Sequence, residues 1–173
     1  MQEAHQKYSE WVSQVIRLYA DSEYVEYEWM IGSIPMEYYQ NNCSNTQIFI
    51  FNCVSETPHK IGKEVITRYW ISPFESRRVF FTDSNGREMM PRLSNYRPTW
   101  NADIKEPVAG NYFPVTTVIS TRDSLSEFGV LVDRAQGATS LEEGVLEIMV
   151  SLKFQKRQSE KSALKIIKMN KIK

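Results

Sequence analysis

The sequence predicts an all-β protein built as an antiparallel β-sandwich. Three features of its 173 residues support this fold class. Short runs rich in β-branched and aromatic residues recur along the chain, polar turn clusters separate them, and the clearest run alternates apolar with charged residues. That run is VEYEWMI (Val25–Ile31). Because successive side chains of a strand point to opposite faces, we expect its apolar row to face a core and Glu26 and Glu28 to face solvent.

The other expected strands follow the same composition along the chain. They are Val15–Tyr19, Ile48–Val54, Glu64–Ile71, Arg78–Thr82, Tyr112–Ser120, Phe128–Val132 and Val145–Phe154. Gly, Asn and Pro supply the dihedral angles that tight turns need. On that basis turns are expected at Ile34-Pro35, Ser84-Asn85-Gly86, Arg97-Pro98, Ala109-Gly110-Asn111 and Gln136-Gly137. The length suits one domain with its own core.

The most unusual stretch is FFTDSNGREMMPRLSNYRPTW (Phe80–Trp100). Asn85-Gly86 predicts a tight hairpin, because both residues tolerate a positive φ. Charged, amide and aromatic residues then follow within a short span. From the residues alone, this stretch is a hairpin with polar side chains.

Charge divides the chain into an acidic body and a basic end. Residues 153–173 hold eight of the 21 Lys and Arg residues and one acid, Glu160. The body therefore has a formal charge of −7 and the end +7. We expect a β-sandwich over residues 1–153 and a basic tail over 154–173, disordered or a short helix. A basic amphipathic helix that binds an anionic membrane surface or nucleic acid is the alternative.

Residues 40–60 differ in composition from the rest of the chain, because they are rich in Asn, Ser and Thr around the short apolar run IFIF. The segment holds both cysteines, Cys43 and Cys53, whose spacing suits one bridge across a hairpin; two unpaired thiols are the alternative. Asn42 starts the sequon Asn-Cys-Ser, a glycosylation candidate for a chain in the secretory pathway. The first ten residues lack the apolar core of a signal peptide, and no run is long enough for a membrane span.

Catalytic and metal-binding patterns are sparse. The only histidines, His5 and His59, belong to no zinc-ligand motif, and no Gly-rich phosphate loop or GxSxG elbow occurs. Three carboxylate pairs could in principle flank a sugar bond: Asp21/Glu23, Glu26/Glu28 and Glu142-Glu143. Their turn-like or alternating context favours an ordinary charged surface. The residues therefore predict neither a metal site nor catalytic residues in this chain.

Six ordered blocks resemble the region after the catalytic domain in the lysosomal-type α-mannosidases of glycoside hydrolase family 38. They are YSEWVSQVIRLYA (Tyr8–Ala20), VEYEWMIGSIP (Val25–Pro35), IGKEVITRY (Ile61–Tyr69), FFTDSNGREMMPRLSNYRPTWN (Phe80–Asn101), EPVAGNYFPV (Glu106–Val115) and LVDRAQGATSLEEGVLEIMV (Leu131–Val150). The resemblance implies a galactose-mutarotase-like supersandwich. It also implies that zinc and the catalytic carboxylates belong to a separate barrel domain.

The resemblance further implies a supporting role. The enzymes of this family remove terminal α-linked mannose from glycoprotein oligosaccharides in the lysosome, and their β domains pack on the catalytic domain and help to wall its pocket. That role is carried over to two segments, whose candidate pocket-wall residues are Asp83, Asn85, Arg87, Asn95, Tyr96 and Arg97. The expected partners are the catalytic domain and, through the full enzyme, mannose-containing oligosaccharide. No nucleic acid is expected. A carbohydrate- or partner-binding module without catalytic activity is the alternative.

Two segments depart from the family pattern. The family passes directly from the equivalent of Ile34-Pro35 to that of Gly62-Lys63-Glu64, whereas this chain inserts about twenty residues, and the basic tail replaces a basic pair with an acidic, Gly-rich loop. We therefore interpret residues 40–60 as a non-family insert and residues 154–173 as a non-family tail.

Overall fold

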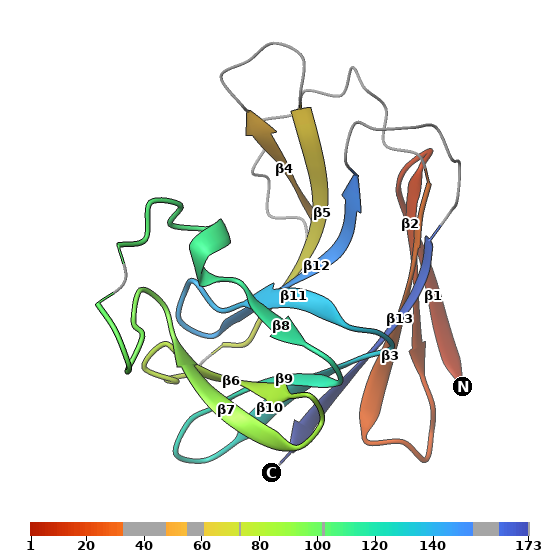
Figure 1. Ribbon diagram of the computed structural model, residues 1–173. Helices are drawn as coiled ribbons and strands as arrows, with labels where there is room; N and C mark the ends of the chain where they lie inside the picture. Colours follow the sequence, from red (N-terminus) through yellow and green to blue (C-terminus); the bar gives the residue numbers. More distant parts are fainter. Residues whose placement is uncertain (33–47, 55–60, 73, 102, 154–162, 173) are drawn as a thin grey trace.

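The computed structural model describes residues 1–32, 48–54, 61–72, 74–101, 103–153 and 163–172. These residues form two antiparallel sheets and one short 3-10 helix, η1 (Ala109–Asn111). Figure 1 shows β1, β2, β3 and β13 as one upright group, with β6, β7, β9 and β10 continuing below. The predicted all-β, antiparallel sandwich is confirmed.

Sheet A has eight strands and sheet B five. In spatial order, sheet A consists of β1 (Gln2–Ser9), β2 (Val12–Leu18), β3 (Tyr24–Ile31), β13 (Ala163–Ile172), β10 (Glu127–Val132), β9 (Val118–Arg122), β6 (Val79–Ser84) and β7 (Glu88–Leu93). Sheet B consists of β4 (Ile48–Val54), β5 (Ile61–Trp70), β12 (Val145–Lys153), β11 (Gln136–Thr139) and β8 (Phe113–Val115).

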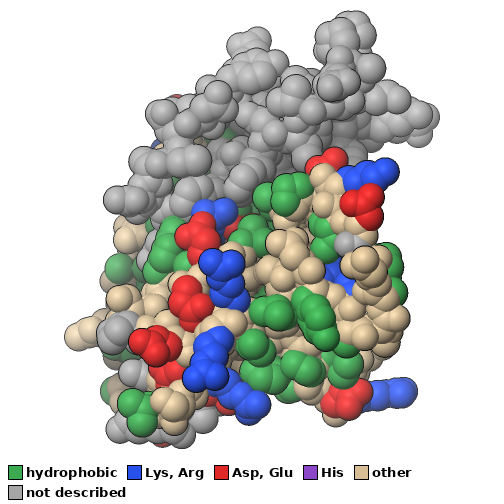
Figure 2. Space-filling view, turned by 90° about the vertical axis from the view of Figure 1, so that its left-hand side faces the viewer, with side chains coloured by type: hydrophobic (Ala, Val, Ile, Leu, Met, Phe, Trp, Pro, Cys, Tyr) green, Lys and Arg blue, Asp and Glu red, His purple; other side chains and the backbone are tan. Residues whose placement is uncertain are grey.

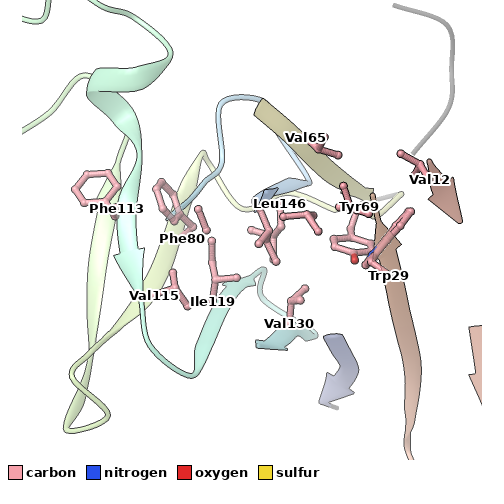
Figure 3. Close-up of a cluster of buried hydrophobic side chains, with 14 residues drawn as sticks. Val12, Trp29, Val65, Tyr69, Phe80, Phe113, Val115, Ile119, Val130 and Leu146 are labelled. Atoms are coloured by element: carbon pink, nitrogen blue, oxygen red, sulfur yellow. The ribbon is translucent and has the colours of Figure 1, made fainter. Parts of the chain in front are cut away.

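The core lies between the two sheets (Figure 3). Sheet A contributes alternate residues of its strands, including Trp29, Phe80 and Ile119, which are almost completely buried. Sheet B contributes Leu146 and Ile148 from β12 together with residues of β5, β8 and β11. The period of two therefore holds in core strands of both sheets, such as β3 and β12, where one row of side chains turns inward.

Strand β3 follows the predicted alternation. Trp29 and Ile31 are buried, and Tyr27 packs against the core. The glutamates of the same strand lie on the other face, but they are not free in solvent. Glu26 and Glu28 form ion pairs with Arg17 of β2, so the outer face here is a cross-strand charge network.

The expectation of a disordered or helical tail differs from the structure. Residues Ala163–Ile172 form β13, which lies between β3 and β10 within sheet A. Its register pairs Ala163 with Ile31 and Ile167 with Val132. Residues 167–170 pair with both neighbouring strands, and the backbone hydrogen bonds of these two ladders outweigh a Lys-rich composition that favours solvent.

Residues 40–60 contribute one described strand, β4, which pairs antiparallel with β5 from Ile48–Thr67 to Val54–Ile61. This strand was predicted with the same bounds. Asn42 and Cys43 lie outside the described residues, so the glycosylation site and the disulfide with Cys53 stay predictions.

Replacing a large core side chain tests the sandwich core. Phe80→Ala removes a ring that is completely buried and meets the Phe113 ring edge-on at 5.7 Å. We expect a loss of about 3 to 5 kcal/mol in the free energy of unfolding, measured by urea denaturation. Leu125→Ala is the matched control, because Leu125 is 88% exposed and its removal should change stability by less than about 0.5 kcal/mol. Equal effects of the two variants would contradict the described core.

Deleting residues 154–173 tests the position of β13. Without this strand β3 and β10 lose their hydrogen-bonded partner, and sheet A separates into two parts. We expect the shortened chain to lose cooperative thermal unfolding, followed by circular dichroism. The control lacks only Lys173, which follows β13. A deletion variant that melts like the full chain would show that residues 163–172 are dispensable for the sheet.

Candidate functional site

The stretch Phe80–Trp100 forms the β6–β7 hairpin and the loop that follows it. At the turn, Asn85 and Gly86 both have positive φ, 52° and 69°, and the Arg87 N–H donates to the Ser84 carbonyl oxygen at 3.0 Å. Two consecutive positive φ values are typical of the type I′ turn, which matches the twist of the paired strands. The predicted hairpin is confirmed.

Asp83 is a buried carboxylate at the turn end of this hairpin. Its Oδ1 accepts backbone N–H groups of Thr116, Thr117 and Val118 at 2.8, 3.1 and 3.3 Å, and its Oδ2 accepts that of Gly86 at 3.1 Å. Burial alone raises the pKa of Asp83, but these backbone donors together hold the pKa well below its ordinary value. The carboxylate therefore joins the β6–β7 turn to the β8–β9 connection as a charged acceptor.

The other end of the hairpin is joined to the motif EPVAGNYFPV. Asn95 has a φ of 59° and exchanges two hydrogen bonds with the buried side chain of Asn111, each 2.8 Å long. Asn111 also donates to the Pro107 carbonyl oxygen at 2.7 Å. Asparagine tolerates the left-handed region better than most residues, so its position here follows from the backbone.

Two arginines contact the ring of Phe113. The guanidinium carbons of Arg92 and Arg97 lie 4.7 and 4.6 Å from the ring centroid. Arg97 also donates to the carbonyl oxygens of Gly110 at 2.6 Å and Tyr96 at 2.9 Å. Burial and then the charge of Arg97 lower the pKa of Arg92. Cation–π attraction stabilises both charges, and neither arginine has an ion pair within the described part of the chain.

Large aromatic side chains are exposed beside these arginines. Tyr96 is 56% and Trp100 62% exposed, on the loop that follows β7. This loop lies on the left in Figure 1, and Figure 2 turns that side of the molecule to the viewer. Basic, acidic and hydrophobic side chains lie next to one another on this face. The combination resembles the surfaces that bind proteins or sugars more than a uniformly charged surface.

The structure does not bring the six candidate pocket-wall residues together. Asp83, Asn85 and Arg87 lie at the turn end of the hairpin, whereas Asn95, Tyr96 and Arg97 follow its other end. The register runs from Val79–Leu93 to Ser84–Glu88, a length of roughly 17 Å at 3.3 to 3.4 Å per residue. They form two separate clusters, one structural around Asp83 and one partly exposed around Arg97.

Two of the three carboxylate pairs considered from the sequence, Glu26/Glu28 and Glu142-Glu143, have structural partners. Glu143 accepts the Ser76 hydroxyl at 3.0 Å and the backbone N–H groups of Arg77 and Arg78 at 2.8 and 3.0 Å. Glu142 is exposed and lies 3.8 Å from Arg68. These contacts indicate structural roles for both glutamates rather than a pair that flanks a sugar bond.

Sequence reasoning missed a buried acid on the outer face of sheet B. Glu147 is 1% exposed and accepts hydrogen bonds from Arg68 Nε and the Tyr112 hydroxyl. Alternation along β12 puts Leu146 and Ile148 in the core and Glu147 on the opposite face, which sequence patterns treat as solvent. Its cross-strand partner Arg68 is the signal that could have revealed the pair.

The described residues offer no fit for a zinc ion. No group of three or more His, Cys, Asp or Glu side chains among them could hold a metal. His5 instead contacts Glu3 at 2.6 Å on the exposed edge strand β1. The acids nearest the candidate clusters accept several hydrogen bonds each, a donor set that suits structural carboxylates rather than zinc ligands.

Residues 1–156 match the model of the glycosyl hydrolases family 38 C-terminal domain. The chain belongs to this family. It is 44% identical over 150 residues to a lysosomal alpha-mannosidase of Mus musculus and 45% identical over 150 residues to that of Homo sapiens, covering 87% of the chain in each case. An alpha-mannosidase of Canavalia ensiformis is 41% identical over 148 residues, 86% of the chain. The predicted resemblance is confirmed.

The matched region is a small part of each family 38 relative. It covers 13% of the length of the mouse, human and Canavalia ensiformis proteins. The matched length agrees with the C-terminal region that the sequence blocks indicated. Within the residues that the structure describes, no helix is long and apolar enough to cross a membrane.

The pKa of Asp83 predicts an acid-dependent stability. Because the folded pKa lies below the unfolded value of about 3.9, the stabilisation is complete above about pH 4 and declines as the pH falls through the folded pKa. Asp83→Asn removes the charge and should lower the free energy of unfolding by about 1 to 3 kcal/mol at pH 7. Denaturant titrations between pH 2 and 7 should show the difference between parent and variant shrinking with acid. Parallel curves over the whole range would refute this role.

Proposed function

We propose that this chain is the β-sandwich region of a lysosomal-type α-mannosidase that removes terminal α-linked mannose from glycoprotein oligosaccharides. One observation carries the proposal: identity of 44 to 45% over 87% of the chain to two lysosomal alpha-mannosidases. On this proposal zinc and the catalytic carboxylates are supplied by a catalytic domain, and the present residues support that domain.

Hydrogen bonding of Asp83, which is buried, and of Glu143, which is exposed, supports a structural rather than a catalytic role. Asp83 accepts four backbone N–H groups, and Glu143 accepts two together with a hydroxyl. A general acid or base must exchange a proton with substrate, but although burial raises the pKa of Asp83, its backbone donors hold that pKa well below the ordinary value and keep the carboxylate ionised. We therefore assign these side chains to the positioning of loops.

The loop after β7 is the proposed contact surface for the catalytic domain. It presents Tyr96 and Trp100 to solvent and holds Arg97 over Phe113. Tyr, Trp and Arg are the residues that contribute most binding energy at protein interfaces, because they bury large areas and retain polar groups for hydrogen bonds. The two hydrogen bonds between Asn95 and Asn111 fix this loop to the sandwich.

The relatives also guide the proposed location and substrate. Two of them carry the name lysosomal alpha-mannosidase, so we assign this protein to the lysosome or the secretory pathway. Mannose-containing oligosaccharide is its proposed substrate through the full enzyme. These assignments depend on the family relationship and on no residue of the sandwich by itself.

A second candidate function follows from the exposed aromatic side chains. Tyr96 and Trp100 could stack on sugar rings, as the aromatic residues of carbohydrate-binding modules do. Retention of the purified chain on mannose resin, abolished by Tyr96→Ala with Trp100→Ala, would favour this function. Passage through the resin without retention would favour the interdomain contact.

A hybrid enzyme tests the main proposal. In the α-mannosidase of Canavalia ensiformis, the 148 aligned residues are replaced by those of this chain. We expect the hybrid to hydrolyse a chromogenic α-mannoside, whereas the isolated chain, with or without added zinc, does not. Adding Tyr96→Ala and Trp100→Ala to the hybrid should lower its thermal half-life at least several-fold, because each removes a large interface side chain.

Leu125→Ala provides the control for that experiment, since Leu125 is exposed on the β9–β10 turn and is not one of the residues of the proposed contact surface. An inactive hybrid that is nevertheless folded would overturn the assignment to this enzyme. Turnover by the isolated chain would overturn the supporting role.

A further inference from the structure

A cavity of about 320 Å³ lies at one end of sheet A, away from the core. Its walls come from the β5–β6 connection, the start of β6, the end of β9 and the turn after β9. Phe80 points into the core, so its neighbours on β6, including Phe81, face the opposite side, where the cavity lies. The side chains used below are Glu75, Arg77, Phe81, Arg122, Asp123 and Ser124.

One wall is held in an unusual backbone conformation. Arg77 and Arg78 are consecutive non-glycine residues with positive φ, 53° and 60°. The left-handed region disfavours side chains with a Cβ, and glycine would adopt it at lower cost. Glu143 compensates by accepting both backbone N–H groups and the Ser76 hydroxyl. The sequence therefore keeps an arginine side chain at a position where the backbone favours glycine.

Another wall is the β9–β10 turn, which side-chain hydrogen bonds hold in place. Asp123 Oδ1 accepts the N–H groups of Leu125 and Ser126, both at 2.7 Å, and this fixes the β9–β10 connection. Immediately before it, the Arg122 guanidinium carbon lies 4.4 Å from the centroid of the Phe81 ring. The ring supports the guanidinium and restricts its movement, so the charge is positioned in advance of any ligand.

The two arginines of the cavity lack acidic partners. Among the described residues, the ion pairs involve neither Arg77 nor Arg122. A guanidinium carries donors only and stays charged, and its planar fork matches the oxygens of a phosphate or carboxylate. The hydroxyl of Ser124 adds a neutral donor to the same wall. Two opposing charges also line the cavity: Glu75, which is exposed, and Asp123, whose carboxylate accepts the N–H groups of its own turn.

We propose that this cavity binds a doubly charged oxyanion, a phosphate or dicarboxylate, through Arg77 and Arg122. The guanidiniums lie on two different walls, which suits a ligand small enough to contact both at once. Glu75 and Asp123 repel the ligand and limit its affinity. This site uses none of the residues proposed to contact the catalytic domain, so it stands independently of that function.

Calorimetric titration of the full chain with inorganic phosphate tests the proposal, with ionic strength held constant by chloride. We expect saturable binding that weakens at least ten-fold in Arg122→Gln and tightens several-fold in Glu75→Gln. Arg78→Gln is the matched control, since Arg78 shares the left-handed backbone but does not line the cavity, and it should bind as the parent does. Succinate in place of phosphate separates the two ligand types by their relative affinities.

Arg77→Gly separates binding from folding. Glycine relieves the positive φ, so we expect the melting temperature to rise by a few degrees while phosphate affinity falls at least ten-fold. A merely structural arginine would not produce opposite changes in these two measurements. Absence of saturable binding of either probe in the parent, or affinities unchanged in both Arg77→Gly and Arg122→Gln, would overturn the proposal.

Discussion

Carboxylates that accept backbone N–H groups of other segments are the interaction on which the loops of this sandwich depend. Strands satisfy their own hydrogen-bonding groups, but the connections between them do not, and an unpaired buried N–H costs about 1 to 3 kcal/mol. Asp83 accepts backbone N–H groups of the β8–β9 connection, and Glu143 accepts those of the segment before β6. Each acid joins segments far apart in the sequence, and Glu143 thereby fixes the cavity wall that contains Arg77.

Family membership and structure assign different weights to the same residues. The motif around Asn85-Gly86 is the most conspicuous part of the sequence, yet its polar residues mainly complete a turn and anchor it. The loop with Tyr96 and Trp100 follows the same motif and leaves its aromatic rings in solvent. A short sequence block can thus contain both a structural anchor and a contact surface, separated by the length of a hairpin.

Patterns with a local physical cause could be predicted from the sequence. The alternation in β3 and the Asn-Gly turn depend on a few adjacent residues, and both were identified correctly. Gln136-Gly137 was expected to be a turn but lies in β11, where Gly137 packs against Tyr112: an added Cβ would lie 3.1 Å from that ring. Such a contact between distant segments, like the separation of the candidate residues into two clusters, has no signature in neighbouring residues.

The place of β13 in sheet A has a consequence for how the chain is made. Its partner β3 ends at Ile31, and that residue pairs with Ala163, so sheet A is completed only after all the strands between them have been synthesised. Contacts of such long sequence separation slow folding, because a large loop must close before they form. Until β13 has been made, the β3 edge of the β1–β3 meander has no strand partner, and it can pair with other nascent chains. Pairing of β3 on this edge therefore waits until β13 has been synthesised.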